Sequence, residues 1–491
     1  MTDERRLAGP AQVPAHEPHA AEPAGTDGQA GSNDVEPTAF RAPPFDEPPT
    51  SPQSAASRAS AQSAWHKVSR QVAGRSSPTT LRYLGLAGTL GVALAGSRPV
   101  GLIGVAVLGF AWFQLRHVTS QRWLLVTAAL WALPLLAVPP LFSGDAYAYA
   151  CQGDLLVHGL SPYQHGVADR PCPWLGHVPE LWWHTPTPYG PLWVAITGLA
   201  AKAGNLWVAI GVLRLAVLVG IALAIGYGRR HSAWLAAASP LVLLHAASGV
   251  HNDALLAGLV VAGLALARDA RWGLAAGVLL GLAVAVKVTA VVAIPFAVLL
   301  VTRKRAWAGV AAGAAGAFAA VTAATGLGFG WLPALSHTAD LVQWTSPPTG
   351  VGMAAGYLLR AAGRPDLAPG ALVVARAAGL VTLAVLLALL WWRRRPAWLA
   401  LAATALLGPV FFPWYALVPL AVLAAEPMAQ RARIGLATLL LALLVLPDGT
   451  GLASLTKPVG AFLDVALVSA VAVGLVRRLR AGRARPTPTG P

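Results

Sequence analysis

Long apolar stretches separated by short polar turns dominate the chain from Leu81 onward. Each stretch has about the length that an α-helix needs to cross the roughly 30 Å hydrocarbon core of a bilayer. The pattern predicts an all-α polytopic membrane protein with about 14 transmembrane helices. We place them at residues 81–97, 100–115, 123–141, 205–228, 232–249, 252–268, 272–287, 288–302, 307–327, 369–392, 397–411, 412–426, 432–447 and 460–477.

Composition and charge agree with this interpretation. Only 11% of the residues are charged, whereas soluble globular proteins average about 25%. The basic residues gather in short runs between apolar stretches, such as Arg229-Arg230, Arg303-Lys304-Arg305 and Arg393-Arg394-Arg395. Such runs mark the cytoplasmic ends of membrane helices, so we predict a multi-pass plasma-membrane protein with both termini in the cytoplasm. The net charge of +16 therefore reflects topology, and no nucleic-acid partner is expected.

One apolar stretch conflicts with that orientation. Counting both 188–203 and 205–228 as spans would place Arg229 and Arg230 on the exoplasmic side. Basic runs are rare there, so we interpret the segment from Tyr189 to Ala203 as a juxtamembrane, half-inserted helix.

The chain is thereby divided into three parts. Residues 1–78 are rich in Ala, Pro, Ser, Gly and acidic residues, and a segment this poor in apolar side chains is predicted to be a disordered cytoplasmic tail. It has no apolar core of the signal-peptide type. Residues 79–478 form the membrane domain, with long exoplasmic loops at 142–188 and 328–368, and residues 479–491 form a basic cytoplasmic tail.

The first exoplasmic loop opens with Ser143-Gly144-Asp145. Ser and Gly before an Asp are typical of a helix start, where the carboxylate interacts favourably with the helix dipole. A carboxylate at the membrane boundary can also act as a general base that accepts a proton from an attacking sugar hydroxyl. The two roles are compatible, and the residues alone leave both open.

The same loop has a high aromatic load, including Trp182, Trp183 and Tyr189. Such side chains commonly form an aromatic belt at the headgroup level, and they also stack on sugar rings. Cys151 and Cys172, the two cysteines of the chain, both fall in this loop. A disulfide is permitted on the exoplasmic side, and we hypothesise a bridge between them.

Two further polar groups interrupt apolar hairpins. His251-Asn252-Asp253 lies at a turn, where a cap explains Asn-Asp but does not require the neighbouring His, so a functional role is favoured. Lys287 would lie deep in lipid if residues 272–302 were one span, and a helix break at the exoplasmic side removes most of that cost. Snorkelling and binding of a lipid-carrier phosphate both fit an ammonium at such a break.

Metal binding is weakly indicated. The sequence has no ligand spacing of the zinc type, so we predict no metal ligands. It leaves open a divalent cation held by Asp145 and Asp253.

Taken in order, these motifs resemble those of the GT-C-fold glycosyltransferases, and most closely the actinobacterial polyprenol-phosphomannose-dependent α-1,6-mannosyltransferases. The likeness covers about residues 80–478. The matching stretches are Gly144–Gly153, Gly159–Tyr163, Tyr189–Trp193, His251–Leu255, Lys287–Ala290 and Phe412–Leu417.

The resemblance implies roles for individual residues. Asp145 would be the catalytic base, and Lys287 would hold the donor phosphate. The side chains implied in substrate binding are Tyr147, Gln152, Asp154, Tyr163, Tyr189, His251, Asn252, Asp253, Lys287, Trp414 and Tyr415.

We therefore expect an inverting glycosyltransferase that works on the exoplasmic face. Its partners would be membrane lipid, a polyprenyl-phosphate mannose donor and a lipid-anchored mannan acceptor, extended through an α-1,6 linkage. The alternatives are an arabinofuranosyltransferase that uses polyprenyl-phosphate arabinose, and a transporter or flippase of lipid-linked sugars. A transporter concentrates polar residues at the bilayer midplane, whereas here they collect at one membrane face, which favours the enzyme.

Overall fold

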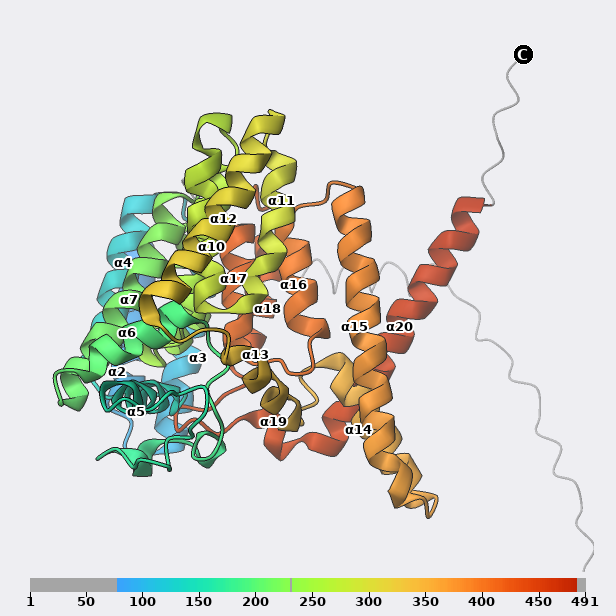
Figure 1. The fold of residues 1–491 in the computed structure, drawn as a ribbon, viewed down its shortest axis with the longest axis horizontal. Helices are drawn as coiled ribbons and strands as arrows, with labels where there is room; N and C mark the ends of the chain where they lie inside the picture. Colours follow the sequence, from blue (N-terminus) through green and yellow to red (C-terminus); the bar gives the residue numbers. More distant parts are fainter. Residues whose placement is uncertain (1–76, 230–231, 484–491) are drawn as a thin grey trace, which may run out of the picture. The chain divides into compact units, whose positions relative to one another are not determined.

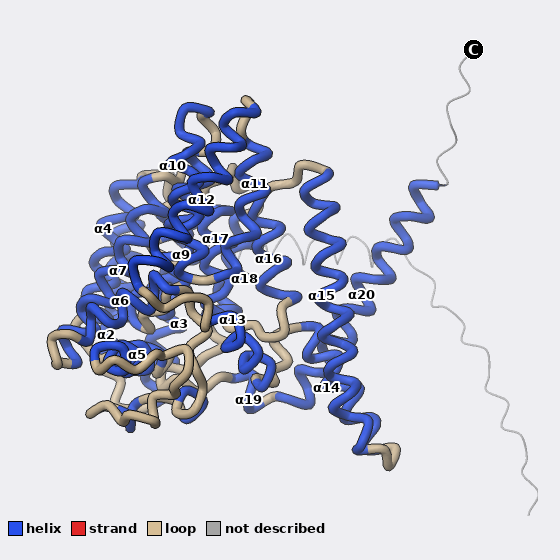
Figure 2. The backbone as a smooth tube through the Cα atoms, in the orientation of Figure 1, coloured by secondary structure: helices blue, strands red, loops and turns tan. Residues whose placement is uncertain are grey.

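The computed structural model describes residues 77–229 and 232–483, and within these ranges the chain is helical and contains no β-strand (Figures 1 and 2). The predicted disordered tail falls almost wholly outside the described residues, as does the end of the basic C-terminal tail. The α-helices are α2 (Pro78–Ala93), α3 (Arg98–Gln114), α4 (Gln121–Leu136), α5 (Asp145–Val157), α6 (Pro191–Ala201), α7 (Leu206–Gly226), α8 (Ala233–Ala236), α9 (Asp253–Leu266), α10 (Gly273–Val286), α11 (Ala293–Leu300), α12 (Lys304–Thr325), α13 (Trp331–Ala334), α14 (Pro347–Ala361), α15 (Ala368–Trp392), α16 (Ala397–Leu407), α17 (Leu417–Ala424), α18 (Arg431–Ala442), α19 (Leu452–Leu455) and α20 (Lys457–Arg483).

Short turns of other helix types link some of these helices. The π-helical segment η4 (Val242–Ser248) precedes α9. Among the 3-10 turns, η6 (Val288–Val292) precedes α11, η7 (Leu335–Asp340) follows α13, and η9 (Pro413–Ala416) precedes α17.

Every stretch predicted as a span contains a helix, and the helices are consistent with a membrane protein. In the described part of the chain, five are long and apolar enough to cross a bilayer: Arg98–His117, Leu206–Gly226, Lys304–Thr325, Pro365–Trp392 and Lys457–Arg478. A sixth is obtained if η4 and α9, which meet at 108°, are counted as one broken span. The other apolar helices are shorter, so the number of about 14 spans stays a prediction.

Two expectations about boundaries can be compared with observed helices. α6 covers 11 residues of the segment predicted to be half-inserted, and this length is too short for a full crossing. Its depth in a membrane stays a prediction. α20 continues to Arg483, beyond the expected end of the membrane domain at residue 478.

Close helix packing relies on small residues, as it does in lipid. α10 and α12 pack along much of their lengths. A Cβ atom added to Gly277 of α10 would collide with the backbone carbonyl of Val310 in α12. The close contact of these two helices therefore requires the absence of a side chain there.

A half-buried arginine fixes the chain just before the first polar loop. Arg214 of α7 donates hydrogen bonds to the carbonyls of Leu136 at 2.6 Å and Val138 at 2.7 Å. These carbonyls lie at the C-terminal end of α4, where helical backbone acceptors lack intrahelical partners. The sequence places Arg214 inside an apolar stretch, where a cation needs such acceptors. The contact anchors the segment that leads to Asp145.

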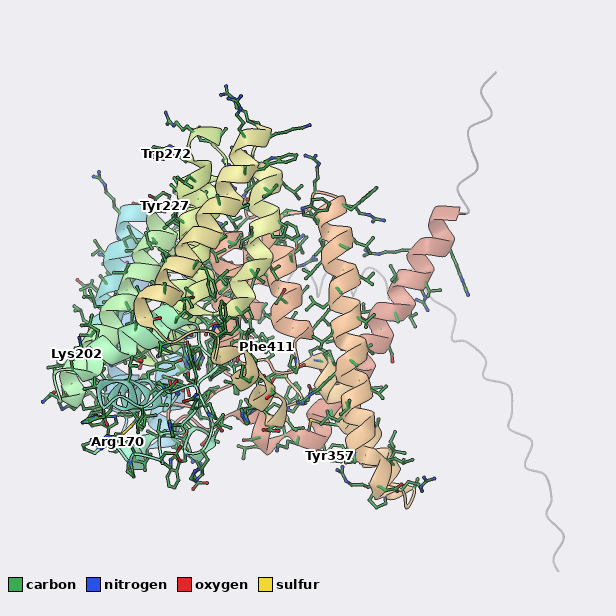
Figure 3. All side chains as sticks on the ribbon, viewed as in Figure 1. Arg170, Lys202, Tyr227, Trp272, Tyr357 and Phe411 are labelled. Atoms are coloured by element: carbon green, nitrogen blue, oxygen red, sulfur yellow. A yellow bond between two sulfur atoms is a disulfide. The ribbon has the colours of Figure 1, made fainter. Side chains whose placement is uncertain are left out.

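Different loops and turns lie at the two ends of the helices. α5 and α14 lie toward the end that carries Arg170, Lys202 and Tyr357, and the turn with Trp272 lies at the opposite end (Figure 3). The basic runs that follow α11 and α15 also lie toward the Trp272 end. This separation agrees with the charge pattern, although the side of the membrane on which each end lies stays a prediction.

Candidate active site

A cavity of about 410 Å³ lies between the start of α5, the start of α9, η6, α16 and η9. Six of the twelve predicted site residues line it: Asp145, Tyr189, Asp253, Lys287, Trp414 and Tyr415. They come from segments far apart in the sequence, and the helix packing brings them to one place.

Asp145 is the first residue of α5, where unpaired backbone N–H groups favour a nearby negative charge. Only 9% of the residue is exposed. Its Oδ1 accepts a hydrogen bond of 3.0 Å from Nε1 of Trp182. Burial raises the pKa of Asp145 to about 6, while the Trp182 hydrogen bond and the Lys287 ammonium limit the rise. The carboxyl group is therefore largely ionised at neutral pH and able to accept a proton.

Lys287 and Asp253 form a buried ion pair beside Asp145. Nζ of Lys287 donates to Oδ1 of Asp253 at 2.9 Å and to Oδ2 at 3.1 Å. Lys287 adopts an extended backbone conformation that ends α10 before η6. The sequence predicts this break from the cost of an ammonium in lipid, and the break is confirmed. The ammonium also lies 3.9 Å from the centroid of the Tyr415 ring, a cation–π contact.

This pairing bears on metal binding. Both oxygens of Asp253 accept hydrogen bonds from Lys287, so a cation shared with Asp145 would compete with that ammonium. Among residues 77–229 and 232–483, no cluster of three or more His, Cys, Asp or Glu side chains is arranged to hold a metal. The site of two carboxylates stays a hypothesis, and we derive no step through a metal.

Aromatic rings form one wall of the cavity. Trp414 stacks on His251 with ring centroids 3.7 Å apart and on Phe412 at 4.7 Å. His251 is fully buried behind Trp414, and its Nδ1 lies 3.6 Å from Oδ2 of Asp145. The Phe-Pro-Trp-Tyr segment thus places flat apolar surface next to the proposed base, an arrangement that suits a sugar ring or the start of a lipid chain.

The Tyr-Gly-Pro segment connects the first loop to the lysine. The amide N–H of Gly190 donates to the carbonyl of Val286, the residue before Lys287, at 3.0 Å. A Cβ atom on Gly190 would collide with the backbone of Ala285, so only glycine permits this contact. Tyr189 is thereby held against the end of α10, and its carbonyl accepts a 3.0 Å hydrogen bond from the Tyr163 hydroxyl.

The remaining predicted residues do not line the cavity. They are Tyr147, Gln152, Asp154, Tyr163, His251 and Asn252. Asp154 points toward His158 and Arg170, at 3.5 and 3.7 Å. It follows Asp145 by about two and a half helical turns at 3.6 residues per turn, so it lies on the opposite face of α5. Gln152 and Asn252 are buried, and their amide groups have no hydrogen-bond partner among the residues that the structure describes.

Trp182 was not among the predicted site residues. The sequence marked it only as part of an aromatic load, yet its indole N–H contacts the carboxylate at the centre of the site. It ends a 3-10 turn (Glu180–Trp182) in an irregular loop, where no periodicity predicts which way a side chain points. Ser143, Thr338, Gln343 and Thr404 also line the cavity without having been predicted.

A disulfide stabilises this loop. Cys151 of α5 is bonded to Cys172, with Cα atoms 5.6 Å apart, as the sequence suggested. The bond attaches α5 to the loop that carries Trp182, so the carboxylate and its hydrogen-bond donor belong to one cross-linked unit.

Apolar side chains also line the cavity. They include Leu401 and Ala405 of α16, Val410, and Val418 of α17. A cavity lined by both charged and apolar side chains suits an amphiphilic ligand.

The chain is similar to known proteins over most of its length. Residues 58–303 match the family model described as alpha-(1->6)-mannopyranosyltransferase, N-terminal domain, and residues 348–478 match the MptB C-terminal domain. Alpha-(1->6)-mannopyranosyltransferase A of Mycobacterium tuberculosis is 35% identical over 388 residues, which cover 71% of this chain and 75% of that protein. A second alpha-(1->6)-mannopyranosyltransferase of that organism is 32% identical over 433 residues, covering 69% and 72%. Alpha-(1->6)-mannopyranosyltransferase B of Corynebacterium glutamicum is 28% identical over 436 residues, covering 75% and 71%. No solved structure matches the chain.

Proposed function

Because the chain belongs to the alpha-(1->6)-mannopyranosyltransferase family, we propose that it moves mannose from polyprenyl-phosphate mannose to a lipid-anchored mannan acceptor. The new bond is an α-1,6 linkage, as the names of the relatives indicate for their own products. The reaction takes place on the exoplasmic face, an assignment supported by the basic runs at the opposite end of the helices. The proposal includes the GT-C architecture of about 14 spans.

One observation carries the proposal: a carboxylate, an ammonium and many apolar side chains line one cavity. Asp145 and Lys287 supply the two charges. A lipid-linked phosphosugar has the matching parts, namely a sugar at the reacting centre, a phosphate that a lysine can hold, and a long hydrocarbon chain. A soluble sugar nucleotide has no hydrocarbon chain to contact the apolar side chains.

The reaction follows from this arrangement. Asp145 accepts the proton of the acceptor hydroxyl, and the oxygen attacks the anomeric carbon of the donor. A new carbon–oxygen bond forms as the bond between that carbon and the phosphate oxygen breaks. The departing polyprenyl phosphate takes the electron pair, and Lys287 stabilises its negative charge. Attack from the face opposite the leaving group inverts the anomeric centre, so a β-linked donor gives an α-linked product.

Neighbouring side chains support the roles of Asp145 and Lys287. Asp253 pairs with the ammonium of Lys287 at 2.9 Å, which lowers the cost of burying the ammonium. A bound phosphate would share that ammonium. Tyr189 and Trp414 line the same cavity and offer ring surface to the sugars.

Family membership supports mannose over arabinofuranose as the transferred sugar. It also supports an enzyme over a transporter, as does the collection of polar groups at one end of the helices. Both alternatives can be tested directly with synthetic lipids.

The experiment uses membranes containing the full-length protein and a fluorescent oligomannoside acceptor. Three donors are compared: polyprenyl-phosphate mannose, polyprenyl-phosphate arabinose and GDP-mannose. We expect extension from the first alone, and nuclear magnetic resonance of the product should show an α-1,6 bond. Extension from the arabinose lipid, or from the nucleotide in membranes depleted of polyprenyl phosphate, would contradict the proposal. Movement of the donor across the bilayer without extension would favour the transporter.

A further inference from the structure

A second groove is formed by helices that reach the Trp272 end, opposite the end where α5 lies (Figures 1 and 3). Its volume is about 240 Å³, and it is formed by α9, α11, α17 and the link between α15 and α16. Leu264, Phe296, Leu299 and Val422 make its walls apolar. It shares no lining residue with the cavity that contains Asp145.

Cations line this groove. Arg394 and Arg395 are exposed lining residues, and in the described part of the chain neither makes an ion pair with an acid. Arg268 also lines the groove, but it is paired with Glu426 at 2.7 Å. The groove therefore combines apolar walls with two arginines available to an external anion.

The backbone at Arg394 is unusual for an arginine. α15 ends in a Schellman arrangement, in which the amide of Arg395 donates to the carbonyl of Leu390 at 2.9 Å and that of Arg394 to Trp391 at 3.0 Å. This motif puts Arg394 at φ 48°, in the left-handed region that favours glycine. A role for the guanidinium in the groove would explain why glycine does not occupy this position.

The groove is also at the right level for a lipid headgroup. Trp392 is 81% exposed and Trp391 42% exposed at the end of an apolar helix, as in the aromatic belts of membrane interfaces. Nε1 of Trp391 donates to the carbonyl of Pro295 at 3.2 Å, which fixes the end of α15 against the first turn of α11.

We propose that this groove binds an anionic diacyl phospholipid, with its phosphate between Arg394 and Arg395 and part of an acyl chain against Phe296 and Leu264. Arginine suits the phosphate because its planar guanidinium donates two parallel hydrogen bonds. The apolar walls select a lipid over free phosphate, and the two unpaired cations select an anionic headgroup over a zwitterionic one. The site is independent of sugar transfer.

The test measures lipids retained by the full-length protein in native mass spectrometry, after incubation with equimolar dioleoyl phosphatidylglycerol and dioleoyl phosphatidylcholine. The double variant Arg394→Gly/Arg395→Gln removes both guanidiniums while giving the positive-φ position a glycine, so the helix end is preserved. Arg393→Gln is the matched control, because Arg393 belongs to the same basic run but does not line the groove. Ala265→Phe fills the groove without changing its charge.

We expect wild type and Arg393→Gln to retain phosphatidylglycerol at least tenfold better than phosphatidylcholine. The double variant should lose this preference, and Ala265→Phe should retain less of both lipids. Glycerol 1-phosphate in tenfold excess should not displace the bound lipid. Equal retention of the two lipids by wild type, or an equal loss in Arg393→Gln, would overturn the proposal and leave only a general surface attraction. Displacement of phosphatidylglycerol by an equimolar polyprenyl phosphate would reject the diacyl assignment.

Discussion

The hydrogen bond from Trp182 to Asp145 gives a prediction that can be worked out in numbers. Trp182→Phe keeps an aromatic ring in the loop but removes the indole N–H that lies 3.0 Å from Oδ1 of Asp145. That N–H stabilises the ionised carboxylate more than the protonated one, so its loss must raise the pKa of Asp145.

The size of the change follows from the strength of such bonds. A hydrogen bond to a charged group contributes about 1.5–3 kcal/mol, and one pKa unit corresponds to about 1.4 kcal/mol. The pKa of Asp145, about 6 in the native protein, should therefore rise by about 1–2 units in the variant. At pH 7 the ionised fraction falls from about nine-tenths to between about one half and one tenth.

The assay is the pH dependence of kcat/KM for mannosyl transfer, which reports the free enzyme's essential groups. Wild type should lose activity as the pH falls through about 6, because the base becomes protonated. In Trp182→Phe this acidic limb should move upward by about 1–2 units while activity at high pH is largely kept. Trp183→Phe is the control, since Trp183 donates instead to the carbonyl of Val178 at 3.1 Å. An unmoved limb in Trp182→Phe, or the same shift in both variants, would refute the reasoning.

Three further predictions concern the surroundings of the site. Lys287→Met leaves Asp253 buried without its partner and should lower the free energy of unfolding by about 3–5 kcal/mol. Adding Asp253→Asn should restore thermal stability but not mannosyl transfer. Recovery of both stability and transfer would exclude a phosphate-binding role for the lysine. Cys151→Ser/Cys172→Ser removes a cross-link with a sequence separation of 21 residues and should lower the free energy of unfolding by about 3 kcal/mol. Proteolysis of the loop should then begin at a lower urea concentration. An unchanged urea midpoint after removal or reduction of the bridge would contradict this. Gly190→Ala forces a Cβ against the backbone of Ala285 and should lower the free energy of unfolding by more than about 1 kcal/mol. A thermal midpoint equal to that of wild type would show that the Tyr-Gly-Pro segment does not pack closely against α10.

The sequence was most informative where the free-energy cost of placing polar groups in lipid limits the structures that the chain can adopt. Apolar length located the helices, and the expense of a buried ammonium correctly predicted a break at Lys287. The same cost explains why Arg214, inside an apolar stretch, donates to backbone carbonyls. These predictions depend on local sequence and on the bilayer, so they need no knowledge of which helices pack together.

The sequence was least informative about contacts between distant segments. The pairing of Lys287 with Asp253 joins the ends of two helices, and each residue had been assigned its role separately. The contact of Trp182 with Asp145 depends on the path of an irregular loop. The family resemblance implies that Asp154 binds substrate, although the helical period turns it away from the cavity. Only the three-dimensional structure could supply this information.

The central claim, that Asp145 is the base, is tested most directly by transfer in membranes carrying Asp145→Asn. The amide keeps the size of the side chain and an oxygen for Trp182, but it cannot accept the acceptor's proton. We predict that kcat falls by at least about 100-fold, the usual contribution of a general base, while binding of polyprenyl-phosphate mannose, measured by protection against thermal unfolding, is unchanged. Transfer at the wild-type rate by Asp145→Asn, with donor binding intact, would contradict the account.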